Sequence, residues 1–209
     1  MPTDWPALLI GMLVAGYWAR VLRLVVKVRK QTGRAGNFWP AEPLGRVLRI
    51  VWYPAVVAWI VHPLMHAFWP QPGVLLRGLY WQPLVQYPAV AVAAAAFVAT
   101  WVCWKKMGKS WRMGIDPGEK TQLVVTGPYA YVRHPIYALQ CVFAIASLAA
   151  VPTPLMGIVV AIVVLLLQWE ARREEQYLLR IHGEVYARYL ATVGRFIPRS
   201  ISPAHATAL

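Results

Sequence analysis

The sequence predicts an all-α integral membrane protein with about five transmembrane helices, the last two of which form a hairpin broken by prolines. Of the 209 residues, 59% are hydrophobic and 14% are charged. A soluble domain usually has about a quarter charged residues. The apolar residues lie in long blocks and the basic residues lie between them. Composition, segment length and charge placement therefore all favour a membrane protein.

Four apolar blocks cover residues 5–26, 47–69, 83–104 and 136–169. The first three are each close to the roughly 20 residues that cross a hydrocarbon core about 30 Å thick. The fourth block is too long for one helix, and its VPTP sequence contains two prolines, which usually end a helix. We therefore expect two short helices here, 136–150 and 155–169, whose outer ends return to the same side of the membrane.

Basic residues follow the first block, the third block and the hairpin, and only Arg77 falls in a segment assigned to the opposite side. Because cytoplasmic loops carry the excess of lysine and arginine, we expect the N-terminus outside and the C-terminus in the cytoplasm. The inner (cytoplasmic) membrane is the expected location, and no cleaved signal peptide is expected. The net charge of +13 then reflects topology and anionic lipid head groups, and nucleic acid is not an expected partner.

The chain is expected to have two functional parts. Residues 1–104 hold three transmembrane helices and a basic cytoplasmic loop, and residues 105–209 hold a cytoplasmic loop, the hairpin, a C-terminal helix and a tail. Residues 170–190 are expected to form that separate helix, with an apolar stripe against the bundle. The outer connections are short and rich in proline, so a functional site is expected on the cytoplasmic side.

The stretch GPYAYVRHPIYA places a group of polar and aromatic side chains at the start of the hairpin. The group consists of Tyr129, Tyr131, Arg133, His134 and Tyr137. Pro135 suits the first turn of the helix that follows. A helix N-terminus has unpaired N–H groups and a partial positive charge, so it can hold a carboxylate or another anion. An aromatic belt at the membrane interface, with an arginine reaching into the head groups, explains the same residues.

A second polar group, in the sequence QWEARREEQY, ends the other arm of the hairpin. Glu170, Glu174 and Glu175 are three of the eight acidic residues, and acidic residues near membrane depth are often functional. Because the hairpin brings its ends together, we expect Arg133 and His134 to face Glu170 and Glu174. Neighbouring residues project about 100° apart on a helix, so only one of Glu174 and Glu175 can face a pocket directly. A charged interfacial helix is the alternative.

Other chemistries have little support in the sequence. His62 and His66 have a spacing that could hold a metal, but they have no third ligand, and Pro63 is expected to disturb the helix between them. We therefore expect no metal site. Cys103 and Cys141 fall in apolar segments and are expected to be small buried residues. The chain has no glycine-rich dinucleotide loop and no GxSxG motif.

Three motifs taken together resemble the isoprenylcysteine carboxyl methyltransferase family and the related bacterial phospholipid methyltransferases. They are MGKSWRMGID at 107–116, TGPYAYVRHPIYA at 126–138 and EARREEQYLLRIHGEVYARYLATVGRFIP at 170–198. Each motif alone is a weak signal, but their combination is specific, and the resemblance covers roughly residues 84–198. It implies that S-adenosylmethionine is held in a pocket formed by the last two helices and the C-terminal segment.

The resemblance also implies roles for individual residues. The residues expected to bind the cofactor are Tyr131, His134 and Tyr137, with Tyr129 and Pro135 of the same stretch, the acidic pair Glu174 and Glu175, and Tyr186, Tyr189 and Arg195, which close the site. Arg133 and Glu170 are expected to be catalytic residues at the reacting end. Three positions depart from the family pattern: Ala138, His182 and Gly194 stand where glycine, phenylalanine and proline are usual.

The function expected from these observations is methyl transfer from S-adenosylmethionine to a lipophilic acceptor that enters from the membrane. Candidate acceptors are an isoprenylcysteine carboxylate, a phospholipid amine and a small thiol. A membrane sterol or enone reductase that uses NADPH is an alternative, because such enzymes have a similar C-terminal layout. That enzyme would need a site for the 2′-phosphate and a larger helix bundle. The other alternative is a non-enzymatic membrane scaffold, which predicts no cofactor binding.

Overall fold

The computed structural model describes residues 1–32, 43–69, 73–80, 82–111, 114–115 and 123–203. Part of the MGKSWRMGID motif lies outside the described residues, as do the basic residues Arg34, Arg112 and Lys120. Within these ranges the chain is helical and has no strand, apart from one isolated β-bridge. The all-α fold expected from the sequence is confirmed.

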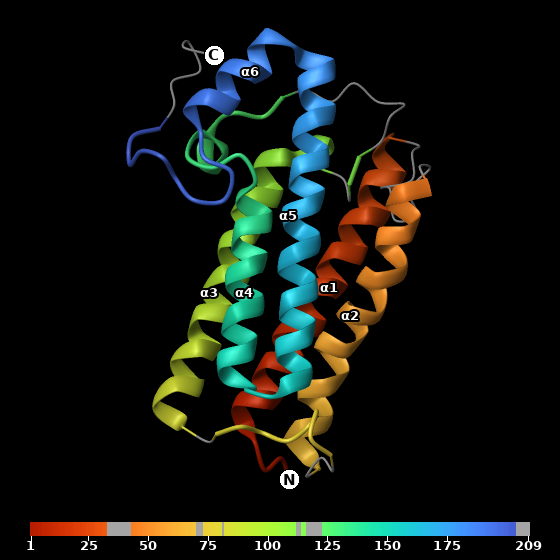
Figure 1. Ribbon diagram of the computed structural model, residues 1–209, viewed down its shortest axis with the longest axis vertical. Helices are drawn as coiled ribbons and strands as arrows, with labels where there is room; N and C mark the ends of the chain where they lie inside the picture. Colours follow the sequence, from red (N-terminus) through yellow and green to blue (C-terminus); the bar gives the residue numbers. More distant parts are fainter. Residues whose placement is uncertain (33–42, 70–72, 81, 112–113, 116–122, 204–209) are drawn as a thin grey trace.

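The described residues form six α-helices and two short 3₁₀ helices. In chain order they are α1 (Trp5–Thr32), α2 (Pro43–Phe68), α3 (Pro83–Met107), η1 (Gly108–Ser110), η2 (Gly127–Ala130), α4 (Pro135–Ala150), α5 (Pro154–His182) and α6 (Glu184–Thr192). Helices α1 to α5 run along the long axis of the molecule as a bundle, and α6 folds over one end (Figure 1). The N-terminus lies at the opposite end of the bundle.

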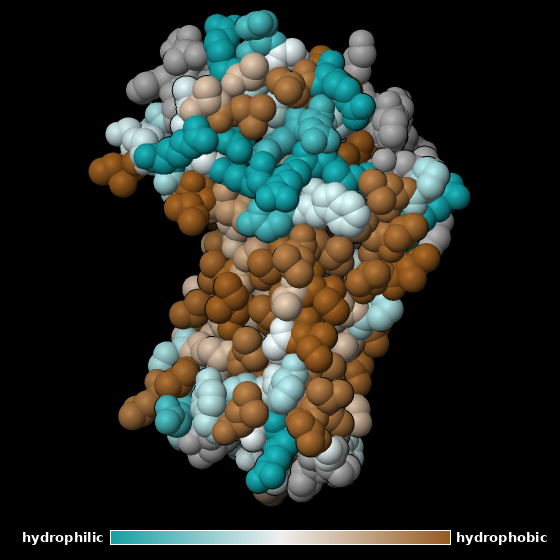
Figure 2. Space-filling model, viewed as in Figure 1, coloured by the Kyte–Doolittle hydropathy of each residue, from teal (hydrophilic) through white to brown (hydrophobic). Residues whose placement is uncertain are grey.

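The helix lengths fit a membrane protein. Four helices, α1, α2, α3 and α5, are long and apolar enough to cross a membrane. Helix α4 has 16 residues, which at 1.5 Å per residue corresponds to about 24 Å, so it is short for a complete span. Figure 2 shows a band of hydrophobic side chains around the middle of the bundle and hydrophilic side chains gathered at the end that carries α6. We call this the polar end.

The structure corrects the expected division of the C-terminal half. Helix α5 does not end near residue 169 but continues to His182, because no glycine or proline occurs between residues 169 and 182. The break comes at Gly183, whose φ of 53° is in the left-handed region that favours glycine. The separate helix expected over 170–190 is therefore the end of α5 followed by the short α6.

The turn of the hairpin lies where the VPTP sequence predicted it. Thr153 precedes α5, and its Oγ1 accepts a hydrogen bond of 3.1 Å from the Met156 N–H. Its Oγ1 also lies 2.7 Å from Nε2 of His62 on α2, which ties the turn to the neighbouring helix. The expected disturbance at Pro63 is wrong, because α2 continues through both Pro54 and Pro63.

Aromatic side chains hold the helices together in the interior of the bundle. The ring of Tyr17 on α1 lies 5.2 Å from the ring of Trp104 on α3 and 5.5 Å from the ring of Phe143 on α4. Tyr17 is almost fully buried, and such aromatic pairs add about 0.5–1.5 kcal/mol beyond their buried area. Helix α3 presents small buried residues such as Ala93 and Ala96, which allow close helix packing in a membrane. This packing fixes the start of α4, where the candidate site lies.

Candidate functional site

The GPYAYVRHP stretch forms a compact turn that leads into α4. Gly127 has a φ of 65°, a conformation that favours glycine, and it begins the 3₁₀ helix η2. Pro135 occupies the first turn of α4, where the missing N–H has no cost, and His134 is the N-cap residue. The side chains of Arg133 and His134 are thereby held at the junction between the turn and the membrane bundle.

The C-terminal segment pairs with this turn through its backbone. The N–H of Arg133 donates to the carbonyl of Gly194 at 2.8 Å, and the N–H of His134 donates to the carbonyl of Arg195 at 3.1 Å. Val132 and Gly194 form the isolated parallel bridge. A Cβ atom on Gly194 would collide with the backbone carbonyl of Ile197. The glycine that departs from the family pattern is therefore required by the local packing.

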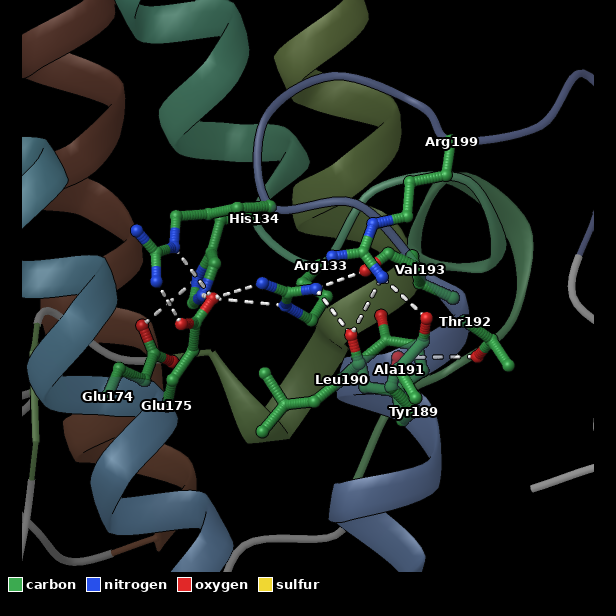
Figure 3. A network of polar contacts seen from close by, with 11 residues as sticks. Arg133, His134, Glu174, Glu175, Tyr189, Leu190, Ala191, Thr192, Val193 and Arg199 are labelled. Carbon is green, nitrogen blue, oxygen red and sulfur yellow. Dashed lines mark hydrogen bonds and ion pairs between the residues drawn. The ribbon is translucent and has the colours of Figure 1, made fainter.

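A buried carboxylate joins three cationic side chains beneath this pairing (Figure 3). Oε1 of Glu175 accepts from Nε of Arg133 at 3.0 Å and from Nε of Arg195 at 2.9 Å. Oε2 of Glu175 accepts from Nη2 of Arg195 at 2.5 Å. Arg133 also donates to the carbonyls of Leu190 and Val193 at the end of α6. The side chains of Arg133 and Glu175 are only 6% and 7% exposed and that of Arg195 is 30% exposed, so a largely buried network connects α5, the turn and the C-terminal segment.

His134 lies between the two neighbouring glutamates of α5. Its Nδ1 is 3.5 Å from Oε2 of Glu174, and its Nε2 is 3.3 Å from Oε1 of Glu175. Burial alone would lower the pKa of His134, but its contacts with the two carboxylates outweigh burial and raise the pKa above its usual value. The ring also stacks on Tyr137, with parallel planes and centroids 5.4 Å apart. The two carboxylates therefore favour the protonated form of His134, and the stacking on Tyr137 orients its ring at the N-terminus of α4.

The expected pairing of the two polar groups is correct in part. His134 does meet Glu174, but Arg133 pairs with Glu175 and Glu170 accepts from Arg173 at 2.7 Å. The expectation that only one of the adjacent glutamates faces a pocket agrees with the geometry. The Glu174 side chain is 30% exposed and lines a pocket, whereas Glu175 points into the ion network.

The first pocket, which we call the polar pocket, has a volume of about 720 Å³ at the polar end. Its polar and aromatic lining residues are Ser110, Tyr129, Arg133, His134, Glu174, Tyr177, Tyr186 and Tyr189. The Tyr189 hydroxyl donates to the Tyr129 carbonyl at 2.6 Å, while the Tyr129 hydroxyl is buried and has no hydrogen-bond partner in the part of the chain described. Burial raises the pKa of the Tyr129 and Tyr186 hydroxyls, so both remain protonated and can donate.

The second pocket, which we call the aromatic cavity, has a volume of about 650 Å³ and lies deeper in the bundle. Six aromatic residues line it, Tyr17, Trp18, Trp52, Trp104, Trp111 and Tyr137, together with the polar residues Arg49, Gln140 and Glu170. A connecting pocket of about 370 Å³ shares Trp111, Ile136 and Tyr137 with the aromatic cavity and shares Tyr129, Arg133, His134 and Glu174 with the polar pocket. The polar pocket and the largely apolar aromatic cavity thus lie next to each other at the start of α4.

The structure distributes the residues expected at the site among these spaces. Tyr129, Arg133, His134, Glu174, Tyr186 and Tyr189 line the polar pocket, Pro135 and Tyr137 line the connecting pocket, and Glu170 lines the aromatic cavity. Glu175 and Arg195 form the supporting ion network. Tyr131 is 38% exposed and lines none of these three pockets.

The sequence did not identify several residues that line the pockets. Arg49 was counted only as a charge that sets topology, yet it is buried in the wall of the aromatic cavity. Gln140 also lines this cavity, and its position three residues after Tyr137 was a signal that both share a helix face. Ser110 and Trp111 lie in a motif that the resemblance includes, but their side chains carried no assigned role.

Comparison with known protein families finds a match that includes residues of the candidate site. Residues 89–180 match the Isoprenylcysteine carboxyl methyltransferase (ICMT) family. The chain is ICMT-like. The matched region runs from α3 to the last part of α5 and contains the GPYAYVRHPIYA stretch and both glutamates of the acidic pair. ICMT proteins are methyltransferases, and this part of the chain is similar to them. No curated protein sequence matches the chain.

Helices α1, α2 and α6 lie outside the ICMT-like region. The aromatic cavity is therefore built partly by ICMT-like residues of α4 and α5 and partly by residues of α1 and α2. The polar pocket likewise combines ICMT-like residues with Tyr186 and Tyr189 of α6. Both ends of the site therefore extend beyond the region that the family match covers.

Proposed function

We propose that this ICMT-like protein is an S-adenosylmethionine-dependent methyltransferase that binds its cofactor in the polar pocket and methylates an amphiphilic acceptor in the membrane. The observation that carries the proposal is the connecting pocket, which shares lining residues with both the polar pocket at the bundle end and the aromatic cavity inside the bundle. Such a junction suits a reaction between one water-soluble and one lipid-soluble reactant. The family match independently supports methyl transfer.

The residues of the polar pocket fit the chemistry of this cofactor. A nucleoside with a charged amino-acid tail needs aromatic surfaces, hydrogen-bond donors and a carboxylate for its hydroxyl or ammonium groups. Tyr177 and Tyr186 supply aromatic surface, and Glu174 supplies a carboxylate that is partly open to the pocket. The unpartnered hydroxyl of Tyr129 is a buried donor that a bound ligand would satisfy.

The cofactor, when bound, supplies an electrophilic methyl group on a sulfonium. The protein has to align the acceptor with that group and exclude water. Trp111, Ile136 and Tyr137 line both the connecting pocket and the aromatic cavity, so we assign them to the boundary between the two reactants. His134 stacks on Tyr137 and fixes the orientation of its ring.

Arg133 acts as a positioning residue in this proposal. Its guanidinium is committed to Glu175 and to two backbone carbonyls, and this arrangement holds the C-terminal segment against the pocket. Glu170, which lines the aromatic cavity and pairs with Arg173, remains the acidic residue assigned to the acceptor side. An isoprenylcysteine carboxylate, a phospholipid amine and a small thiol are the candidate acceptors, and membrane lipids are the surrounding partners.

The proposed topology places the polar end in the cytoplasm and the N-terminus outside. The hydrophilic side chains at that end support this orientation, because a cofactor made in the cytoplasm needs access to the polar pocket (Figure 2). Labelling of single cysteines, introduced near the N-terminus and at the exposed Ser200, with a membrane-impermeant maleimide on whole cells tests the orientation. Labelling at Ser200 and not at the N-terminus would contradict it.

Calorimetry on the detergent-solubilised protein tests the proposed cofactor. S-Adenosylhomocysteine, the stable demethylated product, and NADPH are titrated in parallel. We expect S-adenosylhomocysteine to bind and NADPH not to bind. Binding of NADPH without binding of S-adenosylhomocysteine would replace the proposal with the reductase alternative, and binding of neither would favour a scaffold.

A further inference from the structure

Arg20 on α1 is a cationic side chain that lies against an aromatic ring of the neighbouring helix α3. The central carbon of its guanidinium is 4.8 Å from the centre of the Trp101 ring. Such a cation–π contact attracts the charge but gives the N–H groups no acceptor oxygen. The Nε of Arg20 is buried and has no hydrogen-bond partner in the described part of the chain. Buried donors are nearly always satisfied in proteins, so this nitrogen calls for an acceptor.

The pair lies inside the two helices and not at their ends. Arg20 comes 15 residues after Trp5, the first residue of α1, which at 1.5 Å per residue is about 22 Å along the helix. Trp101 comes six residues before the end of α3, or about 9 Å. Tryptophan is frequent where the apolar core of a membrane meets the head groups, and arginine within a span is costly and often functional. Trp101 is 41% exposed, so a ligand can reach the pair from the membrane.

Three further basic residues continue from this pair toward the polar end, to which both helices run (Figure 1). Arg23 and Lys27 follow Arg20 at i+3 and i+7, which places all three on one face of α1. Lys105 follows Trp101 at i+4 on α3, which packs against α1. All three added residues are exposed. No ion pair within the described residues joins a carboxylate to any of these four basic side chains.

The head group of an anionic phospholipid fits these features. Phosphate oxygens accept charge-assisted hydrogen bonds from arginine, often two in parallel, and so would satisfy the Nε of Arg20. Basic surfaces between transmembrane helices commonly bind anionic head groups. An amine at this position would meet only like charges. The exposed side chains of Val98 and Val102, beside Trp101 on α3, provide apolar surface for the acyl chains.

We propose that Arg20 and Trp101 form a binding site for one anionic phospholipid, whose phosphate lies on Arg20 and whose head group lies among Arg23, Lys27 and Lys105. The site is separate from the candidate site, because neither Arg20 nor Trp101 lines the polar pocket, the aromatic cavity or the connecting pocket. The lipid is a bound partner that joins α1 to α3. It is not the methyl acceptor, so the inference does not depend on the proposed function.

Native mass spectrometry of the whole protein in detergent tests the inference without any cofactor. The protein is titrated with phosphatidylglycerol and with phosphatidylcholine that has the same acyl chains. We expect the first phosphatidylglycerol to bind saturably, with a dissociation constant at least about tenfold lower than that of phosphatidylcholine. Equal affinities for the two lipids would overturn the proposal. Inorganic phosphate at the same concentration as the lipid should not displace it, and displacement would overturn a lipid as the ligand.

Four variants connect the binding to the named residues. Arg20→Gln should weaken binding of phosphatidylglycerol at least about tenfold, the loss expected for a hydrogen bond between charged groups. Arg20→Lys keeps the charge but loses the planar fork, so its affinity should be intermediate. Lys105→Gln should weaken binding several-fold. Arg172→Gln is the matched control, because it removes one positive charge from an exposed position on α5 and should leave the affinity unchanged.

The variants also separate a specific site from general attraction between a basic protein and an anionic lipid. Equal weakening by Arg20→Gln and Arg172→Gln would overturn the proposal, as would wild-type affinity in Arg20→Gln. Thermal unfolding without added lipid shows whether the variants are folded. If Arg20→Gln does not fold, the exposed position of Lys105 keeps the test decisive, and wild-type affinity in Lys105→Gln would then overturn the site.

Discussion

Nε and Nη2 of Arg133 both approach a single carboxylate oxygen, Oε1 of Glu175, at 3.0 and 2.9 Å. Glu175 also accepts a hydrogen bond from Arg195 and lies beside His134, so one buried carboxylate contacts three basic side chains. Breaking a buried ion pair from one side leaves the other charge uncompensated, which is more costly than losing an exposed pair. The relationship identifies Glu175 as the residue on which the local structure depends most.

The first prediction concerns Glu175. Glu175→Gln should lower the free energy of unfolding by about 3–5 kcal/mol, because buried guanidinium groups lose their compensating charge. Denaturant titration in detergent measures this loss. Glu184→Gln is the control, because Glu184 is exposed at the start of α6, and this variant should change stability by less than about 0.5 kcal/mol. Equal stability of the two variants would contradict the role of the network.

A second prediction contrasts two tyrosines that differ in hydrogen bonding. The Tyr189 hydroxyl makes a buried bond to the Tyr129 carbonyl, so Tyr189→Phe should reduce stability by about 1–3 kcal/mol. The Tyr129 hydroxyl has no partner in the described residues, so Tyr129→Phe should leave the stability of the free protein nearly unchanged. It should nevertheless weaken binding of S-adenosylhomocysteine. Thermal unfolding and calorimetry on both variants measure the contrast, and a reversed order of stabilities would refute it.

A third prediction follows from the raised pKa of His134. Because the folded protein holds the proton more tightly than the unfolded chain, this contribution to stability is complete below the unfolded pKa of about 6.5. It is lost as the pH rises through the higher folded pKa. The free energy of unfolding of the wild type should therefore fall as the pH rises above about 6.5, and that of His134→Gln should fall less. Parallel pH dependences in the two proteins would show that His134 is not the titrating group.

The fourth prediction uses the close packing at Gly194. Gly194→Ala should displace the C-terminal segment, because the added Cβ has no room beside the Ile197 carbonyl. Limited proteolysis should then cleave the chain near Arg195 and Arg199 faster than in the wild type. Gly157→Ala is the control, because nothing lies within 4 Å of a Cβ added there and the residue is helical. That control should be neutral or stabilising by about 0.5–1 kcal/mol. Equal cleavage of both variants would argue against the packing.

The sequence was sufficient for the features that depend on local signals. Apolar block lengths predicted the bundle, and the VPTP prolines predicted the turn between α4 and α5. The end of α5 was predicted too early, because the apolar block ends near Trp169 while the helical conformation ends only at Gly183. Hydrophobicity marks where a helix can leave a membrane, but a backbone break marks where it ends.

Only the residues of the site that belong to the sequence motifs could be predicted. The pairing of His134 with Glu174 followed from the hairpin, since both positions lie at ends that the turn brings together. The sequence did not predict that Arg133 pairs with Glu175 and not with Glu170, because the partner depends on which side of α5 each glutamate occupies. Arg49 and Gln140 were missed for a different reason. Their shared cavity arises from the packing of α1, α2, α4 and α5, which no local motif encodes.

The most direct test of the central claim, that the polar pocket binds the cofactor, is the affinity of Glu174→Gln for S-adenosylhomocysteine. Calorimetry should give a dissociation constant about 10- to 150-fold weaker than that of the wild type, corresponding to the loss of one charge-assisted hydrogen bond of about 1.5–3 kcal/mol. Glu184→Gln should retain wild-type affinity. Wild-type affinity in Glu174→Gln would contradict the account and exclude this pocket wall from the cofactor site.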